Sequence, residues 1–209
     1  MSLTLGSIAP DFYAPSTMGD VQFYDWLGDS WGLLFSHPKD YTPVCTTELG
    51  VVAQLKDEFK NRSVKAIALS VDSLDSHFGW IKDIEQSMNT KVEFPIIADE
   101  DKMVAKLYNM IHEDESDTST VRSVFIIGSD KRIKLILTYP MAIGRNFDEI
   151  LRVIDALQLS EKHSVVTPAN WKQDDEVIIS QGLNEKEIEK KFPKGYRKVT
   201  DYLRYTAKP

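Results

Sequence analysis

Apolar and polar residues follow one another in blocks along the first three quarters of the chain, and the spacing within each block separates strands from helices. A short apolar run predicts a strand at residues 31–37, a continuous run of β-favouring residues predicts a second at 64–71, and a third short strand is expected at 94–98. Apolar residues recur every three or four positions, as on one face of a helix, within residues 49–59, 74–84, 99–109 and 146–157. Asp72 and Ser73 offer N-cap side chains to the second of these helices. Strands and helices therefore alternate.

The last part of this pattern changes from alternation to a hairpin. Residues 121–127 and 133–137 bracket the turn Gly128-Ser129-Asp130-Lys131 and predict an antiparallel pair, while residues 111–120 predict an exposed acidic loop. The resulting order is βαβα, β, α, ββα. Crossover units followed by a hairpin and a helix are typical of an α/β, thioredoxin-like fold, here with an inserted helix between its halves.

The composition changes near Ser160, where a tail rich in Lys, Glu and dispersed aromatic residues begins. The chain has 209 residues, which suits one large domain or one domain with a small appendage. We therefore expect a large N-terminal domain at residues 1–160 and a small C-terminal domain at residues 161–209.

Charge and cysteine content narrow the function classes. The net charge is -7, opposite in sign to that of a non-specific phosphate-backbone binder, so we expect no nucleic-acid partner. No apolar run approaches the roughly 18 residues that a membrane span needs, and the first twenty residues contain no Lys or Arg, so no membrane insertion and no targeting segment are expected. Cys45 is the single cysteine and cannot close an intrachain disulfide. A reducing, cytoplasmic location is the expectation.

Cys45 lies where a loop turns into a helix. A lone cysteine is most often a small buried hydrophobic residue. At a helix N-terminus, however, unpaired backbone N–H groups and the positive end of the helix dipole favour the thiolate over the thiol. The position of Cys45 therefore predicts a nucleophilic sulfur.

The residues around Cys45 resemble a known signature. Thr42-Pro43-Val44-Cys45-Thr46-Thr47-Glu48, preceded by Ser36-His37-Pro38, resembles the peroxidatic motif of the peroxiredoxins. Gly28-Asp29-Ser30-Trp31-Gly32, Gly144-Arg145-Asn146-Phe147 and Phe192-Pro193-Lys194-Gly195 are similar to segments of the one-cysteine, peroxiredoxin-6-like branch. The resemblance covers nearly the whole chain, including the C-terminal domain.

The resemblance implies a thiol-dependent peroxidase for antioxidant defence. In this reaction, the Cys45 thiolate attacks hydrogen peroxide or an organic or lipid hydroperoxide and becomes a sulfenic acid, which an external thiol such as glutathione then resolves. By similarity, Thr42 and Arg122 stabilise the reacting oxygens, and Pro43 shields the sulfur from water. By composition alone, an ordinary strand-end arginine in a surface ion pair is as good an interpretation of Arg122 as a functional one.

Three more residues take supporting roles by similarity. Arg145 matches a second family arginine, and Glu48 is placed to hold one or both arginines. His37 matches a histidine near the reactive sulfur, although a satisfied core histidine is the usual outcome. The resemblance implies a homodimer formed by the C-terminal domain, and no bound cofactor.

Two alternatives remain open. Gly28-Asp29-Ser30-Trp31-Gly32 fits G-x-S-x-G, and some members of the branch are described as phospholipases that use this serine. Ser30, however, precedes a strand, Tyr24 occupies the position of the branch's lipase histidine, and Asp130 alone matches the acidic partner. A peroxide sensor or holdase is the other alternative. The four histidines, His37, His77, His112 and His163, look isolated in sequence, so we expect no metal site.

Overall fold

The computed structural model describes residues 3–116 and 118–209. The chain forms two compact units, the first ending at Phe147 and the second running from Asp148 to Pro209. Helix α6 (Phe147–Lys162) begins at this boundary. Each unit has its own sheet, and the two are described separately below.

A five-stranded mixed sheet forms the centre of the first unit. Its order is β5-β4-β3-β6-β7. The strands are β5 (Ile96–Ala98), β4 (Val64–Ser70), β3 (Trp31–Ser36), β6 (Arg122–Ile127) and β7 (Ile133–Tyr139). Strand β3 is parallel to β4 and antiparallel to β6, and β6 and β7 form the expected hairpin. These strands confirm the thioredoxin-like α/β arrangement predicted from the sequence.

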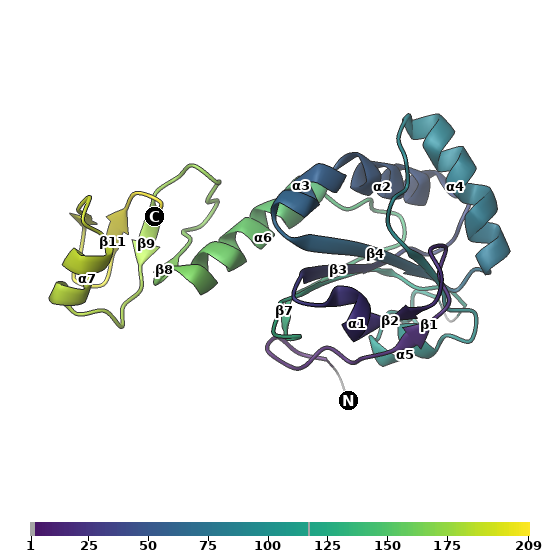
Figure 1. The fold of residues 1–209 in the computed structure, drawn as a ribbon, viewed down its shortest axis with the longest axis horizontal. Coiled ribbons are helices and arrows are strands. Elements are labelled where there is room, and N and C mark those ends of the chain that lie inside the picture. Colours follow the sequence, from purple (N-terminus) through teal and green to yellow (C-terminus); the bar gives the residue numbers. More distant parts are fainter. Residues whose placement is uncertain (1–2, 117) are drawn as a thin grey trace. The chain divides into compact units, whose positions relative to one another are not determined.

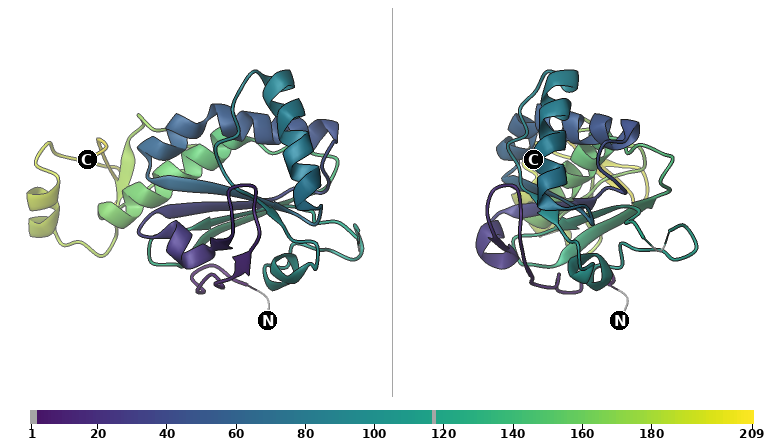
Figure 2. Two further views of the ribbon diagram at one scale, coloured as in Figure 1. Left: turned by 45° about the vertical axis from the view of Figure 1, so that its right-hand side comes forward. Right: turned by 90° about the vertical axis from the view of Figure 1, so that its right-hand side faces the viewer.

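Helices lie on both faces of this sheet (Figures 1 and 2). Helices α2 (Pro43–Gln54), α3 (Lys56–Asn61) and α4 (Leu74–Met88) lie on one face. On the other face, Figure 1 shows α1 (Phe23–Leu27) and α5 (Met103–Leu107). A two-stranded sheet of β1 (Tyr13–Ala14) and β2 (Val21–Gln22), which the sequence analysis missed, lies beside them. Both faces of β3 are therefore covered, and all six of its residues are buried.

Several predicted boundaries shift for local reasons. The helix expected over residues 49–59 is two helices, which meet at Leu55. The helix expected from Asp99 begins at Met103, because the buried Asp99 carboxylate accepts hydrogen bonds from the backbone N–H groups of Val104 and Ala105. The predicted loop at 111–120 contains no helix or strand among its described residues, and Asp117 lies outside them.

The amphipathic pattern of α4 is explained by its burial. Ser73 is its N-cap, as predicted, and accepts a hydrogen bond from the Ser76 backbone N–H. The helix buries His77, Trp80 and Ile84, whereas Phe78, although apolar, is exposed. Within residues 3–116 and 118–209, no helix is both long enough and apolar enough to cross a membrane.

The second unit contains a four-stranded antiparallel sheet of order β10-β11-β9-β8. Its elements after α6 are β8 (Val165–Val166), β9 (Val177–Ile179), α7 (Glu185–Lys191), β10 (Arg197–Lys198) and β11 (Arg204–Thr206). A small core holds it together, made of Val165, Trp171, Val177, Ile179, Ile188 and Phe192. The tail identified by its composition is therefore folded around its own core.

Candidate active site

Cys45 occupies the third position of α2 and is fully buried. Pro43 begins this helix, where its missing N–H costs nothing. The first intrahelical backbone bond runs from the Thr46 N–H to the Thr42 carbonyl, so the amides of Val44 and Cys45 lie ahead of it. The sulfur therefore lies within the turn where the helix dipole is most positive, as the sequence predicted.

Arg122 brings a guanidinium group to this sulfur. It begins β6, and its Nη1 donates to Cys45 Sγ at 3.3 Å. Its Nε and Nη2 donate to the backbone carbonyl of Met141 at 2.9 and 2.7 Å. The Met141 carbonyl thus holds one edge of the guanidinium group, and Nη1 on another edge faces the sulfur.

Glu48 joins two arginines. Its Oε2 accepts from Arg122 Nη1 and from Arg145 Nη2, each at 2.7 Å. Its Oε1 accepts from the Nε and the backbone N–H of Arg145, at 2.9 and 2.8 Å. Burial acts to raise the pKa of Glu48, but the charge and hydrogen bonds of Arg145, with the charge of Arg122, hold it below its usual range. Glu48 is therefore an ionised, fully bonded carboxylate.

Arg145 ties this carboxylate to the sheet. Its Nη1 donates to the backbone carbonyls of Ser36, at the end of β3, and Ser123, at the start of β6, at 2.8 and 3.0 Å. Its guanidinium carbon lies 5.2 Å from the centre of the Phe35 ring. Arg145 thus fixes Glu48, and through it Arg122, to the ends of two neighbouring strands.

The charged side chains around Cys45 sum to a net positive charge. Arg122 and Arg145 carry two positive charges and Glu48 one negative charge, and all three side chains are buried. A buried net charge is costly unless a counter-charge lies beside it. The Cys45 sulfur lies beside this net positive charge, in contact with Arg122.

Thr42 is the N-cap residue of α2 and Pro43 is its first residue, so both precede Cys45 in the chain. Thr42 is half-buried, and its hydroxyl donates to the Lys39 carbonyl at 2.9 Å. Among the described residues this hydroxyl makes no hydrogen bond with Cys45. Pro43 is exposed. Of the predicted residues, the structure thus links Arg122, Glu48 and Arg145 to Cys45 by direct or shared hydrogen bonds.

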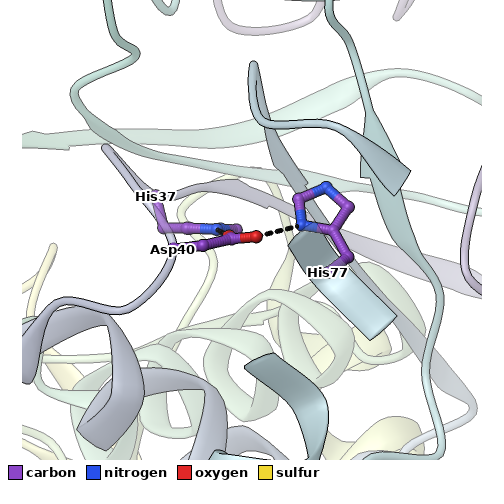
Figure 3. Close-up of side chains that lie close together, drawn as sticks. All are labelled: His37, Asp40 and His77. Carbon is purple, nitrogen blue, oxygen red and sulfur yellow. Dashed lines mark hydrogen bonds and ion pairs between the residues drawn. The ribbon is translucent and has the colours of Figure 1, made fainter. Parts of the chain in front are cut away.

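Two of the four histidines, His37 and His77, lie together in the structure although they look isolated in sequence. His37 and His77 bind the two oxygens of the same buried carboxylate, that of Asp40, through Nε2 at 2.8 Å and Nδ1 at 2.7 Å (Figure 3). The ligand atoms of the three residues lie within 4.8 Å of one another, a set that could also hold a metal ion. Asp40 follows His37 by three residues, a spacing that hinted at the first contact. Nothing in the local sequence indicated His77.

The candidate hydrolase residues do not form a catalytic group. Ser30 is the residue before β3, not the residue after a strand that a nucleophile elbow requires. The Tyr24 hydroxyl donates to the Ala9 carbonyl at 2.6 Å, and its pKa is raised by burial and by the charge of Asp11. Asp130 is exposed and binds Lys134 Nζ at 2.9 Å. No base is thus provided for Ser30 by these residues.

Family models match both parts of the chain. The AhpC/TSA family matches residues 5–136, and the C-terminal domain of 1-Cys peroxiredoxin matches residues 156–195. Together the two matches include Cys45 and the core of the second unit. The order of the two models along the chain follows the order of its two units.

Individual relatives and solved structures agree with these models. A 1-Cys peroxiredoxin from Dictyostelium discoideum is 50% identical over 99% of this chain and 86% of its own length. Peroxiredoxin-6 from Rattus norvegicus is 50% identical over 99% of this chain and 98% of its own length.

Two solved structures share the fold over the whole chain. A cysteine-to-serine mutant of peroxiredoxin 6 from Arenicola marina matches with a TM-score of 0.94 and 47% identity, covering 100% of this chain and 99% of that one. A yeast mitochondrial 1-Cys peroxiredoxin, described for thiol resolution through glutathione and thioredoxin systems, matches with a TM-score of 0.92 and 49% identity over 98% and 99%. The chain belongs to the one-cysteine peroxiredoxins, and it is a thiol-dependent peroxidase.

Proposed function

We propose that Cys45 is the residue that reacts with peroxide. Its thiolate attacks the terminal oxygen of the substrate, the O–O bond breaks, and the sulfur becomes a sulfenic acid while the remaining oxygen leaves as water or an alcohol after taking up a proton. The single observation that carries this proposal is the 3.3 Å contact between Arg122 Nη1 and Cys45 Sγ. A fixed guanidinium at the sulfur is suited to stabilise both the thiolate and the negative charge that develops on the departing oxygen.

The remaining predicted residues take supporting roles in this proposal. Thr42 releases the Lys39 carbonyl and turns its hydroxyl to the bound peroxide, and Pro43 limits access of water to the sulfur. Glu48 and Arg145 position Arg122, which the shared carboxylate contacts support. His37 assists activation or repair of the sulfur.

The electron donor is an external thiol in our proposal. Cys45 is the only cysteine of the chain, so its sulfenic acid has no resolving partner in the same subunit. Glutathione or thioredoxin is the proposed donor class, by analogy with the yeast structure. Hydrogen peroxide and organic or lipid hydroperoxides are the proposed substrates, without a bound cofactor.

The proposed setting is a cytoplasmic homodimer. Residues 161–209 are the proposed dimerisation domain, which rests on the match to the C-terminal peroxiredoxin model. One relative is named as mitochondrial, so fractionation of cells that express the chain is the direct check of its location. Analytical ultracentrifugation with and without residues 161–209 tests the dimer.

The catalytic assignment is tested with Cys45→Ser. A neutral hydroxyl cannot replace a thiolate as nucleophile, so this variant should fold normally and lose the fast reaction with hydrogen peroxide in stopped-flow experiments. Ser87→Ala, a change at an exposed hydroxyl of α4, is the control and should react as the wild type does. Comparable peroxide consumption by Cys45→Ser would refute the assignment. Turnover with glutathione or thioredoxin then identifies the donor.

A further inference from the structure

The carboxylate of Asp40 is buried between two histidine rings. Its Oδ1 lies 2.8 Å from His37 Nε2, its Oδ2 lies 2.7 Å from His77 Nδ1, and Ser76 Oγ donates to Oδ2 at 2.8 Å (Figure 3). Burial acts to raise the pKa of Asp40, but the hydrogen bonds from His37 and His77 outweigh it and lower the pKa below its usual value. Asp40 is therefore an anion that needs a positive partner.

His77 is placed to be that partner. Its Nδ1 faces the Asp40 carboxylate, and its Nε2 faces the backbone carbonyl of Ile97 at 3.1 Å. Both groups are hydrogen-bond acceptors, whereas a neutral imidazole has only one N–H to donate. Only the imidazolium form satisfies both contacts, and an unmade hydrogen bond at a fully buried ring is costly.

His37 is placed to be neutral. Its Nε2 faces Asp40, and its Nδ1 is buried without a hydrogen-bond partner among the described residues. A proton on Nδ1 would be an unsatisfied donor, so the favoured form carries its proton on Nε2 and a lone pair on Nδ1. Burial lowers the pKa of His37, assisted by the charge of His77 and opposed by Asp40 and Asp72.

The His37 ring is connected through Trp80 to the helix that carries Cys45. The ring lies against Trp80, with centroids 5.0 Å apart. Trp80 Nε1 donates to Thr46 Oγ1 at 3.1 Å, and Thr46 in turn donates to the Thr42 carbonyl. Thr46 is the neighbour of Cys45, so His37 and Trp80 together support the first turn of α2.

We propose that Asp40 and His77 form a buried ion pair that fixes His37 in one neutral tautomer. Through His37, Asp40 and His77 are positioning residues for the turn that holds Cys45. The part that concerns Cys45 rests on the function proposed above, whereas the tautomer does not. A metal ion bound by the same three residues would occupy His37 Nε2 and force its proton onto the unpartnered Nδ1. The hydrogen-bonded ion pair is therefore the better account of this cluster.

The first experiment measures the histidine rings of the wild-type protein. Nitrogen NMR of protein with labelled histidine, assigned with single histidine variants, reports which ring nitrogens carry protons at pH 7. We expect both nitrogens of His77 and only Nε2 of His37 to be protonated. A neutral His77, or a proton on His37 Nδ1, would overturn the proposal. Because the same measurement can be made in Cys45→Ser, its outcome is independent of the peroxidase assignment.

The second experiment removes the charge of His77 with His77→Gln, whose amide can still donate to Asp40. Without the positive charge, the His37 pKa should rise. The pH profile of Cys45 alkylation by iodoacetamide should then gain a second inflection at the same midpoint. His163→Gln, the same change at a half-buried histidine of the second unit, should leave both measurements unchanged.

Two results of this experiment count against the proposal. An unchanged His37 titration in folded His77→Gln would contradict the proposed ion pair. A shifted His37 titration without a second inflection in the alkylation profile of Cys45 would contradict the positioning role. If His77→Gln does not fold, the nitrogen NMR of the wild-type histidine rings decides whether the ion pair exists. Stoichiometric Zn²⁺ binding to the wild-type protein, abolished in His77→Gln, would overturn the ion pair in favour of a metal site.

Discussion

Arg122 and Cys45 are 77 positions apart in the chain, yet Nη1 of the arginine lies 3.3 Å from the sulfur. The same nitrogen donates to Glu48 Oε2 at 2.7 Å. The two N–H bonds of this one nitrogen therefore serve a carboxylate and the sulfur, while Nε and Nη2 donate to the Met141 carbonyl. The arginine has little freedom to turn away from Cys45.

The first prediction concerns this arginine. Arg122→Met keeps much of the side-chain length and removes the positive charge, so a smaller fraction of Cys45 should be thiolate at neutral pH. The rate of oxidation by hydrogen peroxide should fall about 100-fold to 1000-fold, as when one preorganised donor is removed from an active site. Stopped-flow fluorescence measures the rate, and iodoacetamide alkylation across pH measures the thiolate. Arg152→Met, at a partly exposed ion pair with Glu149, is the control. An alkylation profile identical to wild type would remove Arg122 from contact with the reacting sulfur.

The second prediction concerns Glu48 and pH. Glu48→Gln leaves two buried guanidinium groups without their carboxylate and should lower the free energy of unfolding by about 3 to 5 kcal/mol. Because the folded-state pKa of Glu48 is lowered, its stabilising contribution is present above its unfolded value of about 4.3 and is lost as the pH falls through the folded value.

The gap in stability between wild type and Glu48→Gln should therefore narrow as the pH falls below about 4.3. Urea unfolding at a series of pH values measures it. Glu93→Gln, which removes an exposed partner of Lys56, should change stability by less than about 1 kcal/mol. A gap that widens towards acid pH would contradict the lowered pKa of Glu48.

The third prediction follows from the single cysteine. One equivalent of peroxide should add one oxygen, which dimedone traps at Cys45, and excess peroxide should carry the sulfur to sulfinic or sulfonic acid and inactivate the enzyme. Because Cys45 is fully buried, a disulfide between two copies should not form, and non-reducing gels should show a monomer band. A predominant Cys45–Cys45 disulfide in mass spectra, or full turnover without added reductant, would exclude a mechanism resolved by an external thiol.

The fourth prediction concerns the hydrolase motif. Tyr24 donates its hydroxyl to a backbone carbonyl and offers Ser30 no base, so hydrolysis of phospholipid by the wild type should be negligible. Ser30→Ala and Tyr24→His, assayed in parallel for peroxidase activity, test the motif. Robust wild-type hydrolysis that Ser30→Ala alone abolishes would show that the missing histidine is not required.

Local periodicity explains which elements the sequence could predict. Strand β3 is buried on both faces, β4 is a run of β-favouring residues interrupted by the exposed Lys65, and α4 has a capping serine and buried residues at helical spacing. The strands of the second unit have two or three residues each, which is too short for any period to be visible. Its core could be read only as dispersed aromatic residues in a charged tail.

The site divides in the same way. The position of Cys45 at a helix start was predictable from a motif of a few adjacent residues, because its chemistry comes from the backbone of that turn. The link between Arg145 and Glu48 spans 97 positions and that between His77 and Asp40 spans 37. Neither has a local signal. Resemblance to a family supplied the two arginines, and only the fold brought the two histidines to one carboxylate.

The balance of buried charges around Cys45 has a consequence for each oxidation state of the enzyme. With Cys45 as a thiolate, Arg122, Arg145 and Glu48 sum with it to zero. If Cys45 is the reacting cysteine as proposed, its sulfenic acid, which is neutral when protonated, would leave one uncompensated positive charge at the site, and this charge would attract an anionic thiolate reductant. A sulfinate is again an anion and restores neutrality. In the proposed cycle, the charges around Cys45 would thus be balanced in the resting enzyme and in its over-oxidised, inactive form, and unbalanced only in the intermediate that must be consumed.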